Sequence, residues 1–424
     1  MSSQKLNVGV IGAGVAGIVA AHRLSKKHNV TLIEAADYIG GHTNTIVLED
    51  GPDVGTPVDT GFIVLNERTY PHFQSFLSEL GVPIRKTDMS FSYYCRETDL
   101  CYSSDFPNGV FAQRRNALNP SFLGMLRDSL RFNKTSVQDL RHGRLSQQTV
   151  KEYLTRNRYS KWFIEHQLMP TAAAIWSSSS VDTMEFPIEA LVKFYENHGL
   201  LSHFGGPGWY VVEGGSHAYV KAFLQRFPGQ VLKNSPVEAI QRQRHQVDVK
   251  LQSGQTIPFD KVIIAAHADQ ALNLLSDPSS EEQRLLGTWR YSNNHTVLHT
   301  DTNIMSQNRR IWASWNYIKD PRASDTHPVN ITYYMNRLQG LKNVKGEYFV
   351  TLNDPQPISQ KHIIKEINYT HPCYTLESMK HQKDLPSLNG QRNTYFCGSY
   401  FGYGFHEDAV RSSVDVARHF DLEP

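Results

Sequence analysis

Residues 6–34 read LNVGVIGAGVAGIVAAHRLSKKHNVTLIE, and this stretch decides the fold. The run LNVGVI predicts a short buried strand, and the glycines Gly12, Gly14 and Gly17 follow it directly. An apolar helical pattern then leads into a second strand-like run that ends at Glu34. A Gly-rich turn arises easily by chance, but strand, turn, helix, strand and acid in this order are typical of a dinucleotide-binding βαβ unit.

Each part of this unit has a physical task. Gly12 permits the tight turn, Gly14 lets the backbone approach a pyrophosphate, and Gly17 lets the helix pack on the strand. The start of the helix supplies free N–H groups and a positive dipole end for phosphates. Glu34 can accept hydrogen bonds from ribose hydroxyls, so NADP, with its 2′-phosphate, is disfavoured. NAD and FAD both stay open at this point.

A second glycine pair at 40–41 follows this acid and precedes His42 and Thr43. The pair would bring further backbone N–H groups to the same pyrophosphate, whereas an NAD domain would be expected to continue into another helix and strand. A Gly-Gly pair is also a common hairpin signal, so the loop alone is modest evidence. A further glycine turn, DTG at 59–61, lies in the segment PVDTGFIVLN.

These segments resemble the FAD-binding amine oxidase superfamily, in which G-x-G-x-x-G, an acid and G-G-R open the chain. In that family a second flavin segment, G-[FY]-x-E-G-A, starts a helix near the C-terminus, and here GFHEDA stands at 404–409. A middle segment matches as PVEAI (236–240) and DKVIIAAHAD (260–269). The resemblance implies an α/β fold, with a Rossmann-like FAD-binding domain of the GR2 type and a discontinuous α+β substrate domain.

The sequence is more closely similar to a bacterial group of predicted flavoproteins in this superfamily, a group linked to fatty-acyl modification. The blocks that carry this similarity span nearly the whole chain. They are VDTGFIVLNERTYP (58–71), AAIWSSS (173–179), WYVVEGGSHAYV (209–220), ASWNY (313–317), TYYMNRLQ (332–339) and FCGSYFGYGFHEDAVRS (396–412).

The resemblance implies FAD as the cofactor and indicates which residues hold it. The sequence does not show whether the flavin is covalently attached, and we expect it to be bound without a covalent link. Val237 is the expected adenine contact, and the helix that starts near Glu407 is expected to direct its N-terminal backbone at the flavin. The expected FAD-binding residues are Gly12, Gly14, Val15, Ala16, Gly17, Glu34, Ala35, Gly41, His42, Thr43, Thr60, Gly61, Phe62, Val237, Ala265, Gly398, Ser399, Phe405, His406, Glu407 and Ala409.

Three positions depart from the family pattern. His42 replaces the arginine after the Gly-Gly pair, and an imidazole is a weaker, pH-dependent partner for a phosphate. Ser399 stands where an acid often lies near the ribityl chain. Phe405 takes the place of the usual tyrosine in the aromatic cage of amine oxidases, which makes an amine substrate less expected.

The chain length of 424 residues favours two domains. The segments between the flavin motifs are helical in pattern from about 111 to 200. From about 292 to 353 they are strand-like, which predicts an antiparallel sheet with one face on a cavity. The expected division is 1–70, 208–268 and 390–424 for the FAD-binding domain, and 71–207 and 269–389 for the substrate-binding domain.

Aromatic side chains in these segments are the candidates for a substrate pocket. Plain core packing explains such residues equally well, because aromatics dominate protein cores. A pocket with aromatic walls and no evident charged clamp suits an apolar small molecule. The candidates are Trp176, Trp315, Tyr333, Tyr334, Tyr400 and Tyr403.

The composition excludes several other classes. A net charge of +2, with 43 basic and 41 acidic residues well mixed, does not favour nucleic acid. The four cysteines form no C-x-x-C pair, and HEDAV at 406–410 lacks the second histidine of a zinc helix, so no metal site is predicted. The N-terminus has no signal-peptide pattern and no apolar run could span a membrane, so we expect a cytoplasmic protein.

The segment 114–134 carries apolar residues at helical spacing, namely Phe122, Met125, Leu126 and Leu130, among several arginines. Such a helix could lie on the inner leaflet of a membrane, as basic amphipathic helices do. The alternative is an ordinary helix packed on its own domain, and we favour this second interpretation.

We therefore expect an FAD-dependent oxidoreductase that removes hydride from a C–H bond of an apolar substrate, such as a fatty-acyl chain. Oxidase, dehydrogenase and desaturase activities all fit. A redox-neutral flavin-dependent isomerase, an amine oxidase and a noncatalytic flavin-binding protein stay open as alternatives. Tyr403 and His406 are the candidate catalytic side chains. The sequence does not indicate the electron acceptor or the oligomeric state.

Overall fold

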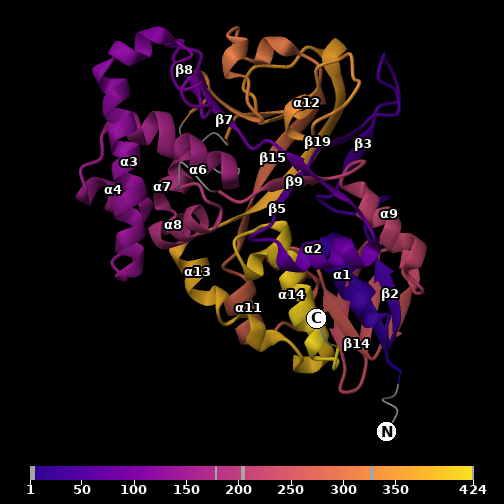
Figure 1. The fold of residues 1–424 in the computed structure, drawn as a ribbon. Helices are drawn as coiled ribbons and strands as arrows, with labels where there is room; N and C mark the ends of the chain where they lie inside the picture. The colour runs from indigo at the N-terminus through magenta and orange to yellow at the C-terminus, as the bar shows by residue number, and fades with distance from the viewer. Residues whose placement is uncertain (1–4, 177–178, 202–205, 325–328, 423–424) are drawn as a thin grey trace.

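The structure is a computed structural model, and it describes residues 5–176, 179–201, 206–324 and 329–422. Figure 1 shows two parts. Near both ends of the chain lies a parallel sheet that includes β2 and β14, together with the helices α1 and α14. The other part holds a mixed sheet, with β7, β15 and β19, beside a group of helices from α3 to α8.

The parallel sheet has the strand order β10-β2-β1-β14-β20, and all neighbouring strands run parallel. The strands come from three pieces of the chain that lie far apart in the sequence, within 1–70, 208–268 and 390–424. The last strand therefore brings the C-terminal glycine-rich segment back to the N-terminal βαβ unit. The strands are Asn7–Ile11 (β1), Asn29–Ile33 (β2), Gln230–Leu232 (β10), Lys261–Ile264 (β14) and Thr394–Phe396 (β20).

Helix α1 (Val15–Leu24) is buried along almost its whole length, although its sequence is not strongly amphipathic. It packs on the sheet and on α14 (His406–Arg418), and its last turn contacts α2 (Pro71–Leu80) through His22 and Phe76, so apolar side chains are needed on most of its surface. On the opposite face of the sheet, a Cβ added at Gly9 would lie 2.8 Å from the Phe259 ring. That ring belongs to a small sheet formed by Val237–Arg242 (β11), Val247–Leu251 (β12) and Thr256–Phe259 (β13).

The second sheet has the order β19-β15-β18-β17-β16-β7-β8. The strands between 292 and 353 pair antiparallel with one another, as the sequence pattern predicts, but the sheet as a whole is mixed. Strand β7 runs parallel to β16, with Phe91 beside Trp315. The alternation from about 292 to 353 could not show this pairing, because β7 comes from a distant part of the chain. The strands are Phe91–Cys95 (β7), Cys101–Ser103 (β8), Arg290–His299 (β15), Trp315–Lys319 (β16), Ile331–Tyr334 (β17), Phe349–Leu352 (β18) and Ile363–Cys373 (β19).

Helices dominate the chain from Pro120 to Asn197. The longest, α3, begins with Asn119 as its N-cap, whose side chain accepts hydrogen bonds from the N–H groups of Ser121 and Phe122. These helices pack on the mixed sheet and on one another. They are Pro120–Arg141 (α3), Val150–Arg156 (α4), Lys161–Phe163 (α5), Met169–Trp176 (α6), Ser180–Glu185 (α7) and Ile188–Asn197 (α8).

The remaining elements connect the two parts. The pair β3-β4 lies within the first piece of the chain, and the short sheet β5-β9-β6 joins strands of the first and second pieces with β6. Ser177 and Ser178 of the AAIWSSS block lie outside the described residues. The elements are Thr45–Val47 (β3), Pro57–Asp59 (β4), Val64–Asn66 (β5), Ile84–Thr87 (β6), Trp209–Val212 (β9), His217–Arg226 (α9), Ala268–Leu274 (α10), Ser280–Leu286 (α11), Met335–Leu338 (α12) and Leu376–Gln382 (α13).

Candidate functional site

A cavity of about 740 Å³ is lined by both parts of the molecule. Such a volume lies within the range of small-molecule and cofactor sites. Most of the predicted FAD-binding residues line this one cavity, although they come from all three pieces of the chain. They are Gly12, Gly14, Val15, Ala16, Glu34, Ala35, Gly41, His42, Gly61, Phe62, Val237, Ala265, Gly398, Ser399, Phe405, His406 and Ala409.

The turn between β1 and α1 has the geometry of a phosphate cradle. Gly12 has a φ of +92°, and a Cβ added there would lie 2.5 Å from the Ala265 carbonyl oxygen. Gly17 does not line the cavity, because it packs on the turn, where an added Cβ would lie 1.8 Å from the Gly12 oxygen. Gly14 differs from both, since an added Cβ would meet no atom within 4 Å. The backbone at Gly14 is therefore open to a ligand at the start of α1.

The second glycine pair packs directly on this turn. The N–H of Gly40 donates to the carbonyl oxygen of Ala13 at 2.9 Å. A Cβ added at Gly41 would lie 3.0 Å from the Gly14 Cα. At Gly61 an added Cβ would lie 2.2 Å from the His42 oxygen, so this glycine is also required for close packing. The three glycine segments thus form one continuous wall of the cavity.

The carboxylate of Glu34 is held at the end of β2 by two backbone donors. Its Oε2 accepts from the N–H of Ala13 at 2.7 Å, and its Oε1 accepts from the N–H of Ala36 at 2.9 Å. Each carboxylate oxygen can accept more than one hydrogen bond. Glu34 is therefore fixed in place with acceptor capacity left for ribose hydroxyls on the cavity side.

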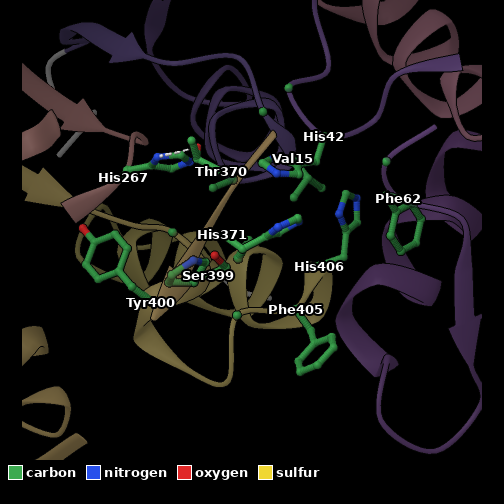
Figure 2. A pocket seen from close by; sticks show the side chains of 18 of the residues that line it. Val15, His42, Phe62, His267, Thr370, His371, Ser399, Tyr400, Phe405 and His406 are labelled. Carbon is green, nitrogen blue, oxygen red and sulfur yellow. Dashed lines mark hydrogen bonds between the residues drawn. The ribbon is translucent and has the colours of Figure 1, made fainter. Parts of the chain in front are cut away.

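Four histidines gather in the wall of the cavity, and Figure 2 shows them arriving from separate segments. We call His42, His267, His371 and His406 the histidine group. The ring centroid of His42 lies 5.2 Å from that of His371 and 6.4 Å from that of His267. The His406 ring stacks on Phe62 with centroids 3.7 Å apart.

Burial keeps the histidine group neutral. It lowers the pKa of His42 to about 4, and the proximity of His267 lowers it further, while a backbone hydrogen bond at Thr370 acts in the opposite direction. Burial also lowers the pKa of His267 to about 4 and, with its two imidazole neighbours, that of His371 to about 3. The His406 pKa is likewise well below its ordinary value, mainly through burial.

Hydrogen bonds define where the proton of His371 lies. Its Nδ1 is 2.9 Å from the Asn294 side-chain nitrogen. The other side-chain atom of Asn294, its oxygen, accepts from the Asn353 side chain at 2.8 Å, so the Asn294 nitrogen is the donor. Nδ1 of His371 therefore accepts, and the neutral ring carries its proton on Nε2.

The two acids at the start of α14 have different tasks. The Asp408 carboxylate accepts from the N–H groups of Tyr403 and Phe405, at 2.9 and 3.1 Å, and so orders the loop before the helix. The Glu407 carboxylate accepts from the N–H groups of His72 and Phe73 at 2.9 Å each, which caps α2. An acid in the first turn usually caps its own helix, as Asp408 does here, but Glu407 caps α2 instead.

Several predicted site residues do not line the cavity. Thr43 bonds the Tyr219 hydroxyl at 2.5 Å, and Thr60 lies 2.8 Å from the Tyr369 hydroxyl. Tyr334 lies on the other side of its strand, against Trp312 and Phe349. The residues outside the lining are thus Gly17, Thr43, Thr60, Tyr334 and Glu407.

The helices, the mixed sheet, strand β9 and the C-terminal segment at 400–405 line the other part of the cavity with aromatic rings. Trp176 lies 6.3 Å from Phe405, and Phe194 stacks on Phe405 at 4.6 Å. The rings of Trp315 and Tyr333 meet edge to face at 4.8 Å. We call this part the aromatic half, lined by Met89, Phe91, Thr171, Ala174, Ile175, Trp176, Phe194, Trp209, Trp315, Tyr333, Tyr374, Tyr400 and Tyr403.

The lining carries almost no charge. Among the described residues that line the cavity, Glu34 is the only aspartate, glutamate, lysine or arginine. It lies at the end of the parallel strand β2, and no residue of the aromatic half comes from the N-terminal βαβ unit that contains this strand. A ligand in the aromatic half would therefore meet apolar and neutral polar groups.

Sequence reasoning missed several residues of the site. His371 lies in β19, a strand that the sequence pattern does not predict. His267 directly follows the AA pair of a recognised flavin segment, so its position was a usable signal. Phe194 and Tyr374 gave no signal, because only the fold brings them to the cavity.

The cavity fits a flavin dinucleotide better than a metal ion. Gly14 leaves open backbone at a helix start, Glu34 has acceptor capacity, and the buried Nε2 of His42 has no hydrogen-bond partner within the described residues. These groups match the pyrophosphate and ribose of a dinucleotide. No cluster of three or more acidic, histidine or cysteine side chains suited to a metal ion occurs in the part of the chain that the structure describes.

Comparison with known proteins agrees with this geometry. Residues 15–315 match the family model described as flavin containing amine oxidoreductase. Beta-cyclopiazonate dehydrogenase of Aspergillus flavus is 24% identical over 310 residues, which cover 70% of this chain and 62% of that protein. The chain thus matches less than two thirds of the length of this curated relative.

Two solved structures share the fold over nearly the whole chain. A fatty acid isomerase from P. acnes, described as producing CLA, has a TM-score of 0.68 at 14% identity, covering 98% of this chain and 99% of its own. Cyclohexylamine oxidase from Brevibacterium oxydans has a TM-score of 0.67 at 15% identity, covering 99% and 100%. At such low identity the likeness concerns the fold alone.

Proposed function

The chain belongs to the flavin-containing amine oxidoreductase family, and we propose that it uses noncovalently held FAD to oxidise a C–H bond of an apolar substrate, with a fatty-acyl chain as the substrate class. A flavin bound in the cavity would supply the hydride acceptor. The FAD-binding residues proposed are those that line the cavity around Gly14, Glu34 and His42, and the substrate residues are those of the aromatic half.

One observation gives the strongest support for an apolar substrate. The aromatic half carries no charged side chain among the described lining residues, so an ammonium or carboxylate buried there would have no ionic partner. The carboxylate of a fatty acid can stay outside the aromatic half, because the C–H bond to be oxidised can lie far along the chain. An amine oxidase must instead bring the carbon beside the nitrogen to the flavin, and so must bury the amine. Burying an unpaired charge is expensive, whereas an aliphatic chain gains free energy from every methylene removed from water. An amine oxidase, the alternative within the same family, would have to bind its substrate without an acid.

The chain's own residues would orient the substrate and exclude water. Packed rings, including the stacked pair Phe194 and Phe405, close the aromatic half. The Trp176 Nε1–H donates to the Tyr403 carbonyl oxygen at 3.3 Å. His371 offers its neutral Nε2–H as a donor. The open N-terminus of α14 provides a positive dipole end in the same wall, which would stabilise negative charge.

The candidate catalytic residues Tyr403 and His406 both line the cavity. Burial raises the pKa of the Tyr403 hydroxyl, and burial lowers the His406 pKa well below its ordinary value. At neutral pH both are therefore neutral. They could position a substrate by hydrogen bonds, but neither is charged for ionic binding.

The substrate class can be tested by ligand binding to the FAD-reconstituted protein. Perturbation of the flavin absorption spectrum would be titrated with saturated fatty acids, fatty alcohols and alkylamines of matched chain lengths. We expect fatty acids and alcohols to bind, with affinity rising roughly fourfold for each added methylene until the cavity is filled. Affinity that does not depend on chain length, or a consistent preference for the amine, would contradict the proposal.

A redox-neutral isomerase is the second candidate. The observation that favours it is the fold of the fatty acid isomerase, which matches 98% of this chain with a TM-score of 0.68. The two activities differ in their products. Turnover that moves a double bond, leaves the mass of the substrate unchanged and consumes no electron acceptor would favour the isomerase, whereas loss of two hydrogens would favour the dehydrogenase.

A further inference from the structure

We propose that the outer face of α3 binds an anionic lipid surface. The side chains of Leu123, Arg127, Leu130 and Lys134 follow one another at intervals of four, three and four residues, so they share one side of the helix. All four are exposed. We call them the outer stripe. In Figure 1 α3 lies at the edge of the molecule, far from the parallel sheet. The proposal does not depend on the proposed function.

The two leucines of the outer stripe and a third leucine just before α3 are unusually exposed. Leu123 and Leu130 are 43% and 56% accessible, and Leu118, in the short 3-10 turn just before α3, is 87% accessible. Leu118 is the most exposed large apolar side chain among the described residues, and Phe106, at 78%, is the next. Apolar side chains gathered within one helix and its entry turn indicate an interaction site more strongly than scattered ones do.

The opposite face of α3 already supplies the packing that the helix needs. Phe122, Met125 and Phe132 are almost completely buried in the core. The apolar face expected from the sequence combined Phe122 and Met125 with Leu130, but the structure divides them between two faces. The helix therefore packs on its own domain and still presents a second, basic face to the outside.

Charge on this segment is strongly asymmetric. Residues 114–144 contain seven lysines and arginines against two aspartates, a net of +5, whereas the whole chain has a net charge of +2. Both aspartates are engaged: Asp128 accepts from Arg131 and from the Ser160 N–H, and Asp139 accepts from Arg144 and the Tyr153 hydroxyl. Two further arginines of the segment pair with acids outside it, since Arg115 lies 3.5 Å from Asp99 and Arg141 lies 3.3 Å from Glu196. The outward positive charge therefore comes mainly from Arg114, Arg127 and Lys134, and it complements an anionic surface.

A bilayer fits this combination better than other occupants. Nucleic acid would pair with the arginines but would leave the leucines in water, and a purely apolar protein partner would leave Arg127 and Lys134 buried without counter-ions. An anionic membrane accommodates the leucines and the basic residues together, because the leucines enter the acyl boundary while the basic side chains reach the headgroups. Within the described residues no helix is long and apolar enough to cross a membrane, so α3 would lie along its surface.

Vesicle flotation of the full chain tests the proposal. The probes are phosphatidylcholine vesicles with and without phosphatidylglycerol, at low and high salt. We expect binding to the anionic vesicles that weakens with salt. Each neutralised basic residue should reduce partitioning roughly fivefold, so Arg127→Gln with Lys134→Gln should reduce it by about 25-fold. Leu118→Asn with Leu123→Asn and Leu130→Asn should reduce it at least as much.

A matched control keeps this test interpretable. Val54→Asn with Leu224→Asn changes exposed apolar side chains elsewhere, and Arg310→Gln removes an exposed charge outside the segment. These variants should bind vesicles like the wild type, and all variants should retain the wild-type melting temperature within a few degrees. Equal binding to neutral and anionic vesicles would overturn the proposal, as would equal losses in stripe and control variants. Self-association that the leucine variant abolishes, with no vesicle binding by the wild type, would assign the face to a second copy.

Discussion

His42 is the residue at which this chain departs most clearly from the arginine-containing pattern it resembles. Its Nε2 is buried without a partner in the described part of the chain, and its ring lies in the same wall as the open backbone of Gly14. Burial lowers its pKa to about 4, so the ring is neutral in the free protein at pH 7. A phosphate bound nearby would favour the imidazolium and raise this pKa.

Substitution of His42 should therefore weaken FAD binding and change its pH dependence. Since binding would raise the His42 pKa, the complex takes up protons, and affinity should fall as pH rises from 5 to 8. His42→Ala should raise the dissociation constant about tenfold, as expected for loss of one hydrogen bond to a charged group, and should flatten this pH dependence. Quenching of FAD fluorescence measures the dissociation constant at each pH, and His295→Ala, at an exposed position, is the control. Equal FAD affinities of the wild type and His42→Ala would show that His42 does not contact the cofactor.

Asp59 is a second residue whose environment has a measurable consequence. It is completely buried, and its partners Thr45 and Ser216 are neutral. Burial raises its pKa to about 6, and the hydrogen bonds only partly oppose this. Because the folded-state pKa lies above the unfolded value, the folded protein binds the proton more tightly, and stability is lost as pH rises through about 6.

The pH dependence of unfolding should show this effect. Between pH 5 and pH 7 the wild type should lose about 1 kcal/mol more of its free energy of unfolding than Asp59→Asn, which cannot ionise. Urea unfolding at the two pH values measures the difference, and Asp50→Asn is the exposed control. Identical pH slopes for wild type and Asp59→Asn would mean that Asp59 does not titrate in this range.

At the scale of elements, the βαβ unit was predictable because its signals are local. The positive φ of Gly12 and the contact between Gly17 and Gly12 depend on residues close together in the sequence. The start of α14 was found for the same reason, but the capping of α2 by Glu407 was not, since its partners lie more than 300 residues away. Strand β7 was missed similarly, because only long-range pairing places it beside β16.

Two alanine substitutions in the first turn should separate binding from folding. The Cβ of Gly14→Ala has free space, so the melting temperature without FAD should change little. The added methyl group would obstruct the approach of a pyrophosphate, so the affinity for FAD should fall at least tenfold. Gly17→Ala would force a Cβ to within 1.8 Å of the Gly12 oxygen and should destabilise the protein by several kcal/mol. Thermal unfolding with and without FAD distinguishes them. Equal losses of stability would refute this division of roles.

At the scale of the whole molecule, the cavity arises from segments that no local pattern joins. The predicted aromatic candidates Trp176, Trp315 and Tyr333 line it, but Tyr334 faces away, because adjacent residues of a strand point to opposite sides. The sequence predicts few charges in this pocket, because the aromatic candidates come with no evident charged clamp. Only the fold shows that Glu34 is the single charged side chain among the described lining residues. The domain boundaries at 70, 208, 268 and 390 stay a prediction.

A charge placed in the aromatic half should change the preference of the cavity. Ile175→Asp introduces a carboxylate where the described lining has none, and Ile175→Asn is the neutral control of the same size. We expect Asp to weaken fatty-acid binding at least tenfold more than Asn, because an unpaired carboxylate would be buried beside an aliphatic chain. Titrations of the bound flavin spectrum measure this ratio. Equal effects of the two substitutions would indicate that the substrate does not enter the aromatic half.

The most direct test of an apolar substrate is anaerobic reduction of the bound flavin. The FAD-reconstituted protein would be mixed without oxygen with a fatty acid, or with an alkylamine of the same chain length, and the loss of oxidised-flavin absorbance would be followed. The proposed function predicts that the fatty acid bleaches the flavin and the amine does not. Bleaching by the amine alone would contradict it and would make the protein an amine oxidase in its reaction as well as in its fold.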